Sequence, residues 1–394
     1  MDKKTFKDID VAGKKVLVRV DFNVPVDDKN NIIDDTRIVA AIPTIKYLIN
    51  NNAKIILCSH FGRPNGVYNE NLSMKIVLPT LNRLLGQEVK MATDVVGESA
   101  KNLASSLKEG EVMLLENVRF HKEEEENDEA FSKQLASLAD IFVLDAFGTA
   151  HRAHASTAGV ARYIPAVAGF LVTKEVTEIE KVTKNPERPC VVIFGGKKVS
   201  DKIGVISAFM DKANTILIGG AMAFTFIVAQ GGEIGLSRYE KDKIDVAKQI
   251  LELADKKNVK ILLPVDVVVT KEFTPNARTK VVKANKIPAD CQSMDIGPKT
   301  RKLFASEIKN AKTVVWNGPL GVYEFKKFKK GTIAIAKAIA KSGAISIVGG
   351  GDSAAAVKES GYADKITHIS TGGGATLEFL EGKTLPGIAM LNDK

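Results

Sequence analysis

The sequence predicts an α/β fold in which parallel sheets are covered by helices and arranged in two domains. Short apolar segments with the character of buried strands alternate with amphipathic segments at helical spacing, a pattern typical of parallel sheets. The length of 394 residues exceeds what a single hydrophobic core usually serves. Two prolines within 185–189 mark a stiff break near the middle of the chain, where we expect the domain boundary.

The strands of the first half are expected at 15–20, 54–58, 111–115 and 141–144. Apolar spacing predicts a helix over 36–51, which Pro43 is expected to kink. Another helical pattern starts at Ser73 and closes at Gly86, a plausible pair of caps. The acidic run Glu123–Glu126 is expected to be a solvated loop or helix start.

Charged and polar side chains follow these strands at the end where parallel sheets bind ligands. They are Asp21, Asn23, His60, Arg63, Arg119 and Arg152, with Arg37 opening the helix after the first strand. Any one arginine is most simply an ordinary surface cation. Four of them at successive strand ends indicate a clamp for a small, highly charged anion, because the guanidinium group donates two parallel hydrogen bonds to carboxylate or phosphate.

The second half ends its predicted strands in glycines instead. Strands expected at 191–194, 215–218, 314–316, 345–348 and 366–370 run into Gly195, Gly219, Asn317-Gly318, Gly349 and Thr371-Gly372 respectively. After the first of these strands come three lysines, Lys197, Lys198 and Lys202, and then a helix that begins near Ile203. Such turns can present backbone N–H groups and cations to phosphates, although the segment does not match a Walker-type loop and its lysines could simply be solvated.

The segment Gly349–Ala354 also fits the pattern G-x-G-x-x-A, so a nicotinamide dehydrogenase is an alternative. A single match is weak, and no clear ribose-binding acid follows at the expected offset. Asp352 suits Mg²⁺ beside nucleotide phosphates, because Mg²⁺ keeps most of its waters. A helix N-cap is the simpler role for the same residue.

Composition and charge narrow the class of protein. A content of 45% apolar and 26% charged residues is typical of globular proteins, the apolar runs are too short to span a membrane, and the first residues lack a signal-peptide core. Cys58, Cys190 and Cys291 are widely spaced, which fits a reducing cytoplasm. The net charge of +9 suits acidic partners, but aromatics make up only 6% and no basic run interleaves with them, which disfavours a nucleic-acid-binding protein.

The motifs, taken together, closely resemble the phosphoglycerate kinase family from near Val16 to the end of the chain. They are, in order, DFNVP, SHFGRP, LLENVRF, DAFGTAHRAHAST, GGKKVSDKI, VVWNGPLGVYEF, GGGDSAA and STGGGA. The resemblance implies two Rossmann-like three-layer α/β/α domains joined by a hinge helix. It also implies a monomeric cytoplasmic enzyme of glycolysis. The implied reaction is the reversible, Mg²⁺-dependent transfer of a phosphoryl group between ATP and the carboxylate of 3-phosphoglycerate, which gives ADP and 1,3-bisphosphoglycerate. The transfer is expected to be direct and in line, after the domains close.

The same resemblance implies the domain bounds and the site residues. The phosphoglycerate-binding domain is expected at 1–172 with 380–394 packed back on it, the hinge helix and linker at 173–188, and the nucleotide-binding domain at 189–379. The residues implied for phosphoglycerate are Asp21, Phe22, Asn23, Arg37, His60, Phe61, Gly62, Arg63, Arg119 and Arg152. Those implied for the nucleotide are Lys198, Lys202, Gly219, Ser293, Asn317, Glu324 at the ribose, Gly350, Gly351, Ser353, and Asp352 as the metal ligand. Those implied near the transferred phosphoryl group are Arg37, Lys198, Gly372 and Gly373.

Two positions depart from the family pattern, and the acceptor sets the mechanism. Lys197 stands where alanine is frequent, and Ser293 stands where glycine is more usual. The acceptor carboxylate is already ionised at neutral pH, so no general base is expected. Asp145-Ala146-Phe147-Gly148 only superficially resembles the D-F-G of protein kinases. Catalysis is therefore expected to consist of positioning and charge stabilisation.

Overall fold

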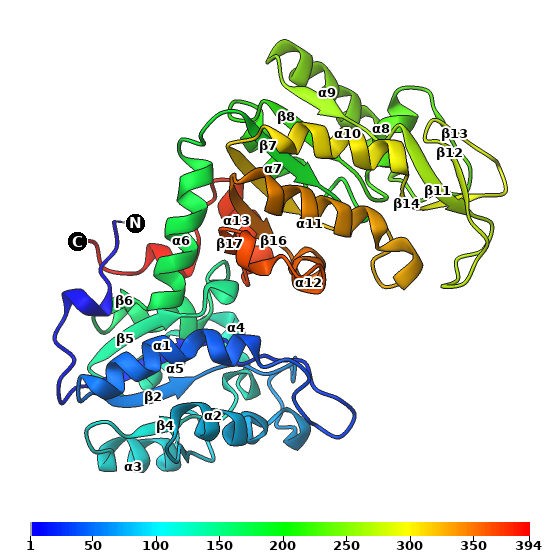
Figure 1. The fold of residues 1–394 in the computed structure, drawn as a ribbon. Helices are drawn as coiled ribbons and strands as arrows, with labels where there is room; N and C mark the ends of the chain where they lie inside the picture. Colours follow the sequence, from blue (N-terminus) through cyan, green and yellow to red (C-terminus); the bar gives the residue numbers. More distant parts are fainter. Residues whose placement is uncertain (1) are drawn as a thin grey trace. The chain divides into compact units, whose positions relative to one another are not determined.

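The structure, a computed structural model, describes residues 2–394 and divides into two compact units (Figure 1). Unit 1 comprises Met1–Thr177 with Thr384–Lys394, and unit 2 comprises Glu178–Lys383. The division falls inside helix α6 (Phe170–Thr183), which begins before the segment 173–188 expected for the hinge helix and linker and ends within it.

Unit 1 is built on a six-stranded sheet in the order β3-β4-β2-β1-β5-β6, in which every neighbouring pair is parallel. The strands are β1 (Lys15–Val20), β2 (Lys54–Cys58), β3 (Lys90–Met91), β4 (Val112–Leu114), β5 (Ile141–Asp145) and β6 (Ala166–Ala168). The helices are α1 (Thr36–Asn50), α2 (Leu78–Leu85), α3 (Glu98–Ser106), α4 (Lys122–Glu126), α5 (Glu129–Ala136) and, from the C-terminal segment, α14 (Pro386–Ala389). The chain leaves β1 toward β2 on one side and reaches β5 on the other, so the strand order reverses at β1, where such sheets bind ligands.

The helices of unit 1 cover both faces of this sheet. Val16 and Val18 pack with Ile38 and Ile45 of α1 in one core cluster. The intervening Leu17 is equally buried, so the opposite face is covered as well. This arrangement is the three-layer α/β/α architecture expected from the near-continuous apolar strands.

Several local predictions for unit 1 are confirmed with differences. Pro43 lies inside α1 without ending it. The Ser73 hydroxyl accepts a hydrogen bond from the Lys75 amide, and Gly86 ends α2 with a left-handed φ of 71°, but the first turn, Met74–Val77, is a 3-10 helix.

The expectation that Glu123–Glu126 is solvated is wrong for Glu124. The run is a short helix, α4, and the Glu124 side chain is fully buried. Its carboxylate accepts hydrogen bonds from both the backbone N–H and the hydroxyl of Ser156, at 2.8 and 2.6 Å. These two donors compensate for the water that burial removes.

Unit 2 repeats the design with the sheet order β10-β8-β7-β15-β16-β17, again parallel throughout. The strands are β7 (Cys190–Phe194), β8 (Thr215–Ile218), β10 (Lys260–Leu262), β15 (Thr313–Asn317), β16 (Ile345–Gly349) and β17 (His368–Ile369). The helices are α7 (Ile203–Phe209), α8 (Ala223–Ala229), α9 (Ile244–Lys256), α10 (Pro298–Lys309), α11 (Lys330–Ser342), α12 (Gly351–Glu359) and α13 (Gly374–Leu380). The order reverses between β7 and β15, and β17 is shorter than the predicted 366–370.

Two small sheets extend unit 2. An antiparallel sheet joins β12 (Lys280–Lys283), β11 (Asp266–Thr270) and β14 (Gln292–Ile296), and β13 (Lys286–Ile287) pairs with β9 (Glu233–Ile234). The sequence analysis did not predict these strands. In the main core, Trp316 of β15 is fully buried with Phe304 of α10 and Ile335 of α11.

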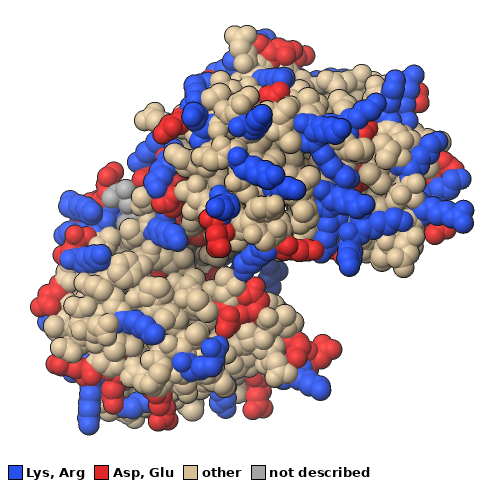
Figure 2. Space-filling model, viewed as in Figure 1, with Lys and Arg blue, Asp and Glu red and all other residues tan. Residues whose placement is uncertain are grey.

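The positive net charge is evident on the surface of unit 2, where Figure 2 shows more Lys and Arg side chains than Asp and Glu. Helices α10 and α11 contribute Lys299, Arg301, Lys302, Lys309, Lys330, Lys337 and Lys341. Such a surface raises the local concentration of anionic ligands in general. Among the helices described in residues 2–394, none has the length and apolar character needed to cross a membrane.

Asp145 closes β5 and anchors the first turn of α6. Its Oδ1 accepts a hydrogen bond from the Leu171 amide at 2.8 Å, and a Cβ on Gly169 would lie only 2.2 Å from the same oxygen. Asp145 is fully buried, and this burial raises the pKa of its carboxyl to about 7. The carboxylate is thus placed where its charged form is disfavoured.

We expect Asp145→Asn to stabilise the protein more at pH 8 than at pH 5. The folded-state pKa lies above the unfolded value, so the penalty of burying the charge grows as pH rises from about 4 to about 7. Asparagine keeps an oxygen that can accept the hydrogen bond from the Leu171 amide, but it carries no charge that folding would bury. Urea unfolding followed by circular dichroism at both pH values measures the difference, with the exposed Asp28→Asn as control. An effect of Asp145→Asn that is equal at the two pH values would contradict this account.

Candidate functional site

The anion-binding residues predicted for unit 1 are held by loops that follow β1, β2 and β4. Arg37, in the first turn of α1, donates to Asp21 Oδ2 at 3.1 Å and to the Asn23 carbonyl at 2.9 Å. Both bonds use the same Nη1 atom. The guanidinium group is therefore fixed in orientation by its neighbours while its other nitrogen atoms make none of these contacts.

The loop after β2 is tied to the neighbouring loops through its backbone. The Gly62 amide donates to Asn23 Oδ1 at 2.9 Å, and Arg119 Nη1 donates to the Gly62 carbonyl at 2.9 Å. The buried Asn117 amide binds the Phe61 backbone on both sides, accepting from its N–H at 3.1 Å and donating to its carbonyl at 2.7 Å. Three side chains from two strand ends, those of β1 and β4, therefore hold one loop in place.

His60 and Arg119 lie in an environment that is both buried and positive. Burial, together with Arg19, Arg119 and Arg37, lowers the pKa of His60 well below its ordinary value, so the imidazole is neutral at pH 7. Burial also lowers the pKa of Arg119, and its Nε makes no hydrogen bond, with Glu125 Oε1 3.5 Å away. An anion bound here would relieve the excess of positive charge.

The other residues expected at this site have different positions. Arg63 and Arg152 are exposed, and Arg152 lies close enough to contribute to the lowered pKa of Arg119. The side chains of Phe22 and Phe61 are buried in the hydrophobic core of unit 1, which leaves only their backbone atoms for a ligand. The backbone groups of Phe61 are already bound by Asn117, and the Phe22 amide donates to Ser59 Oγ at 2.9 Å, so these two residues shape the loops that carry the site.

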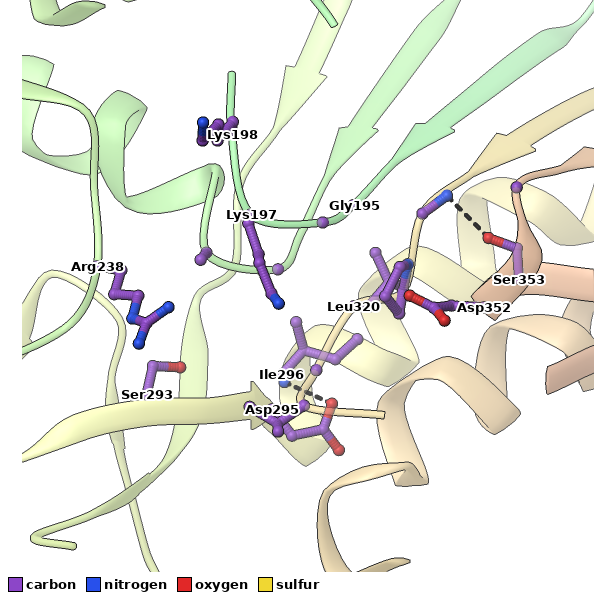
Figure 3. A pocket seen from close by; sticks show the side chains of 18 of the residues that line it. Gly195, Lys197, Lys198, Arg238, Ser293, Asp295, Ile296, Leu320, Asp352 and Ser353 are labelled. Carbon is purple, nitrogen blue, oxygen red and sulfur yellow. Dashed lines mark hydrogen bonds between the residues drawn. The ribbon is translucent and has the colours of Figure 1, made fainter. Parts of the chain in front are cut away.

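Unit 2 contains a pocket of about 660 Å³ beyond the carboxyl ends of β7, β15 and β16 (Figure 3). All the residues expected at the nucleotide except Gly219 line it, namely Lys198, Lys202, Ser293, Asn317, Glu324, Gly350, Gly351, Asp352 and Ser353. Gly219 does not line the pocket, and a Cβ on it would lie 2.6 Å from the Leu320 side chain. The next residue, Gly220, lines the pocket instead.

Two strand-end turns approach each other so closely that they exclude side chains. The amides of Gly195 and Gly196 donate to the carbonyls of Asn317 and Pro319, each at 2.9 Å. A Cβ on Gly195 would lie 2.2 Å from the Pro319 carbonyl oxygen. Part of the glycine pattern therefore reflects contact between turns and not contact with phosphate.

Helices α12 and α13 begin at the edge of the pocket. Gly350 has a φ of 94°, and Asp352 is exposed in the first turn of α12, while the buried Ser353 hydroxyl accepts from the Gly318 amide at 2.8 Å. Before α13, Gly373 lines the pocket, but the Gly372 amide donates to Ser370 Oγ at 3.2 Å. The Gly372 amide thus already has a hydrogen-bond acceptor, and the role expected for Gly372 near the transferred phosphoryl group stays a prediction.

The lysines after β7 differ in their surroundings. Lys202 is buried and donates to Asn317 Oδ1, and burial lowers its pKa. The Nδ2 atom of Asn317 is buried without a hydrogen-bond partner. Lys197 and Lys198 are exposed, and in Figure 3 Lys197 extends into the pocket toward Ile296 while Lys198 points another way. An acceptor in the pocket would satisfy Asn317 Nδ2.

Apolar and aromatic side chains also line the pocket, which suits a flat base. They are Phe224, Val267, Phe273, Met294, Leu320 and Phe325. The Arg238 guanidinium lies 5.9 Å from the centre of the Phe273 ring, a contact that the sequence analysis missed. The Ser293 amide donates to Ser237 Oγ at 3.0 Å, which fixes the loop that carries Arg238.

The residues of the pocket fit Mg²⁺ only as a partner of a bound ligand. Within residues 2–394 the structure places no three His, Cys, Asp or Glu side chains together as a metal site. One carboxylate, Asp352, lies at the edge of the pocket beside the glycine turn. That arrangement suits an ion whose remaining ligands are phosphate oxygens and water.

Comparisons with known proteins agree with this arrangement. A family model described as phosphoglycerate kinase matches residues 6–383. Proteins named phosphoglycerate kinase from Clostridium botulinum (strain Alaska E43 / Type E3) and Finegoldia magna are 57% and 55% identical, covering the whole of this chain and 99% and 100% of those proteins. Solved phosphoglycerate kinases from Coxiella burnetii and Pyrococcus horikoshii OT3 superpose with TM-scores of 0.90 and 0.85 at 41% and 35% identity, each covering 98% of both chains.

We expect Gly195→Ala to lower the urea concentration at which unit 2 is half unfolded. The new methyl group forces two packed turns apart, and overpacking of this kind typically lowers the free energy of unfolding by about 1–3 kcal/mol. Gly351→Ala is the matched control, because a Cβ there meets nothing within 4 Å. Fluorescence of Trp316, the single tryptophan, reports on this unit. Equal midpoints for the two variants would show that the turns are not tightly packed.

Proposed function

Because the chain belongs to the phosphoglycerate kinase family and is a glycolytic kinase, we propose that unit 1 binds 3-phosphoglycerate at its arginine cluster and that unit 2 binds ATP in the glycine-lined pocket. The phosphoryl group then passes directly and reversibly to the substrate carboxylate. The pocket carries this proposal: its lining combines aromatic side chains that suit a base with lysines, helix starts and an unpaired amide that suit phosphates. A cytoplasmic, monomeric enzyme is part of the proposal.

The chemistry needs charge and orientation rather than proton transfer. The acceptor is a carboxylate, already ionised, and the neutral His60 would donate a hydrogen bond to it or to the substrate phosphate. Arg37, oriented by Asp21, would contact the transferring group from unit 1, and Lys198 with the amide of Gly373 would do so from unit 2. Asp352 would hold Mg²⁺, which supplies positive charge beside the nucleotide phosphates.

Direct transfer also requires motion. The two ligands bind to different units, and reacting atoms must approach to about 3–3.5 Å. Closure around both ligands would achieve this and would exclude water, which otherwise hydrolyses an acyl phosphate.

Arg37→Ala and Lys198→Ala are each expected to lower kcat by about 10²-fold or more, because each removes a cation from the transferring phosphoryl group. A coupled assay for ATP-dependent formation of 1,3-bisphosphoglycerate measures this. Lys341→Ala, on the exposed last turn of α11, is the control and should retain full activity.

Lys197→Ala tests how the adjacent lysines divide their roles, since Lys197 is the one that extends into the pocket. If Lys198→Ala keeps a near-normal kcat and Lys197→Ala does not, the role assigned to Lys198 belongs to its neighbour.

ATP and ADP are expected to raise the melting temperature, and NAD is not. A ligand at 100 times its Kd stabilises the folded state by about 2.7 kcal/mol. Differential scanning fluorimetry with each nucleotide and Mg²⁺ distinguishes a kinase pocket from the dehydrogenase that Gly349–Ala354 could suggest. Protection by NAD but not by ATP would refute the nucleotide assignment.

A further inference from the structure

Behind the phosphoglycerate site, a chain of hydrogen bonds connects four buried side chains, Glu124, Ser156, Arg19 and His60. Glu124 Oε1 lies 2.6 Å from Ser156 Oγ, Arg19 Nε lies 2.7 Å from the same oxygen, and Arg19 Nη2 lies 3.2 Å from His60 Nδ1. Exposure of these residues ranges from 0 to 4%. They come from α4, the π-helical turn Ala155–Gly159, β1 and the loop after β2.

The direction of each hydrogen bond follows from the guanidinium group, which donates and cannot accept. Ser156 Oγ must accept from Arg19 Nε, so its own hydrogen is available for Glu124. For the same reason, His60 Nδ1 must accept from Arg19 Nη2 and therefore carries no proton. The ring proton of a neutral His60 is then on Nε2.

We propose that Arg19 is a positioning residue which, with Ser156 and Glu124, holds His60 as the Nε2–H tautomer so that it donates a single hydrogen bond to the anionic substrate. The inference deepens the proposed function, on which it rests for the identity of that substrate. His60 then acts as neither a cation nor a base.

The charges around His60 favour this state. Arg19 faces it from β1, Arg37 from α1, Arg119 from the turn after β4, and His154 from the segment before Ala155. Burial and these groups lower the pKa of His60, and burial with Arg119 and Arg19 lowers the pKa of His154 to about 4. Both burial and the surrounding cations therefore disfavour the imidazolium form of His60.

Glu124 balances the buried guanidinium. Burial raises the pKa of Glu124, whereas Arg19 and the two hydrogen bonds from Ser156 act in the opposite direction. Without this acid, Arg19 would be a buried cation with no anion within reach of its chain of hydrogen bonds, which is strongly unfavourable. Glu124 therefore makes it possible for Arg19 to occupy the position that fixes His60.

The wild-type full-length protein provides the first test. Nitrogen-15 NMR of labelled histidine side chains distinguishes the Nδ1–H, Nε2–H and imidazolium forms, and His60→Gln identifies the signal among the five histidines. We expect His60 to be the Nε2–H tautomer at pH 7 and to become protonated only at a pH well below the ordinary pKa of histidine. An Nδ1–H or imidazolium form at pH 7 would overturn the proposal, whatever the variants do.

Variants provide the second test. In Arg19→Met, His60 should exchange between tautomers and titrate nearer its ordinary pKa, and KM for 3-phosphoglycerate should rise about 10-fold or more with a smaller change in kcat, as for a lost hydrogen bond to a charged group. Ser156→Ala should produce the same changes in smaller degree and serves if Arg19→Met does not fold. Arg83→Met, on the exposed surface of unit 1, is the control.

The two tests separate the possible failures. Unchanged His60 spectra and KM in folded Arg19→Met would mean that the chain of hydrogen bonds is merely structural. The wild-type spectrum requires no substrate, so a fixed Nε2–H tautomer in a protein without kinase activity would refute the proposed function and leave the tautomer assignment standing.

Discussion

Mutual repulsion among cations is the constraint on which unit 1 depends. Arg19, Arg37 and Arg119 all lie close enough to depress the pKa of His60, and Arg119 and Arg19 also act on each other. Three acids limit the repulsion: Asp21 contacts Arg37, Glu125 lies near Arg119, and the buried Glu124 acts on Arg19 through Ser156. A bound anion can neutralise the remaining positive potential. The repulsion that destabilises unit 1 without ligand therefore favours the binding of an anionic ligand.

Unit 2 forms its pocket mainly through contacts between main-chain turns. Its turns pack so closely at Gly195 and Gly220 that a Cβ would lie within 3.0 Å of neighbouring main-chain atoms, and this contact brings several turns and helix starts to one pocket. The cations of the pocket, Lys197, Lys198, Lys202 and Arg238, lie on this main-chain frame. Among these cations, Lys202 is buried and donates to Asn317 Oδ1, and burial lowers the pKa of its ammonium group.

Much of this organisation could be predicted from the sequence, because apolar runs and strand-end residues are local signals. The central strands of both main sheets fall where the pattern indicates, whereas the edge strands β3, β6 and β10 were not predicted. All the residues expected at the nucleotide except Gly219 line the pocket. What escaped prediction depends on contacts between distant residues. Glu124 sits in an acidic run that resembles a solvated surface, yet it is buried because Ser156 offers two donors. Arg19 lies within an apolar strand, and nothing local indicates that its partner is 137 positions away.

The C-terminal segment has a consequence for how the chain acquires its structure during synthesis. Asn392 exchanges hydrogen bonds with Ala166 through its backbone and side chain, and its carbonyl accepts from the Lys4 amide. These residues follow unit 2 along the chain, although they belong to unit 1. The packing of unit 1 therefore cannot be finished until all of unit 2 has been synthesised, because its first residues bind residues that follow unit 2 along the chain.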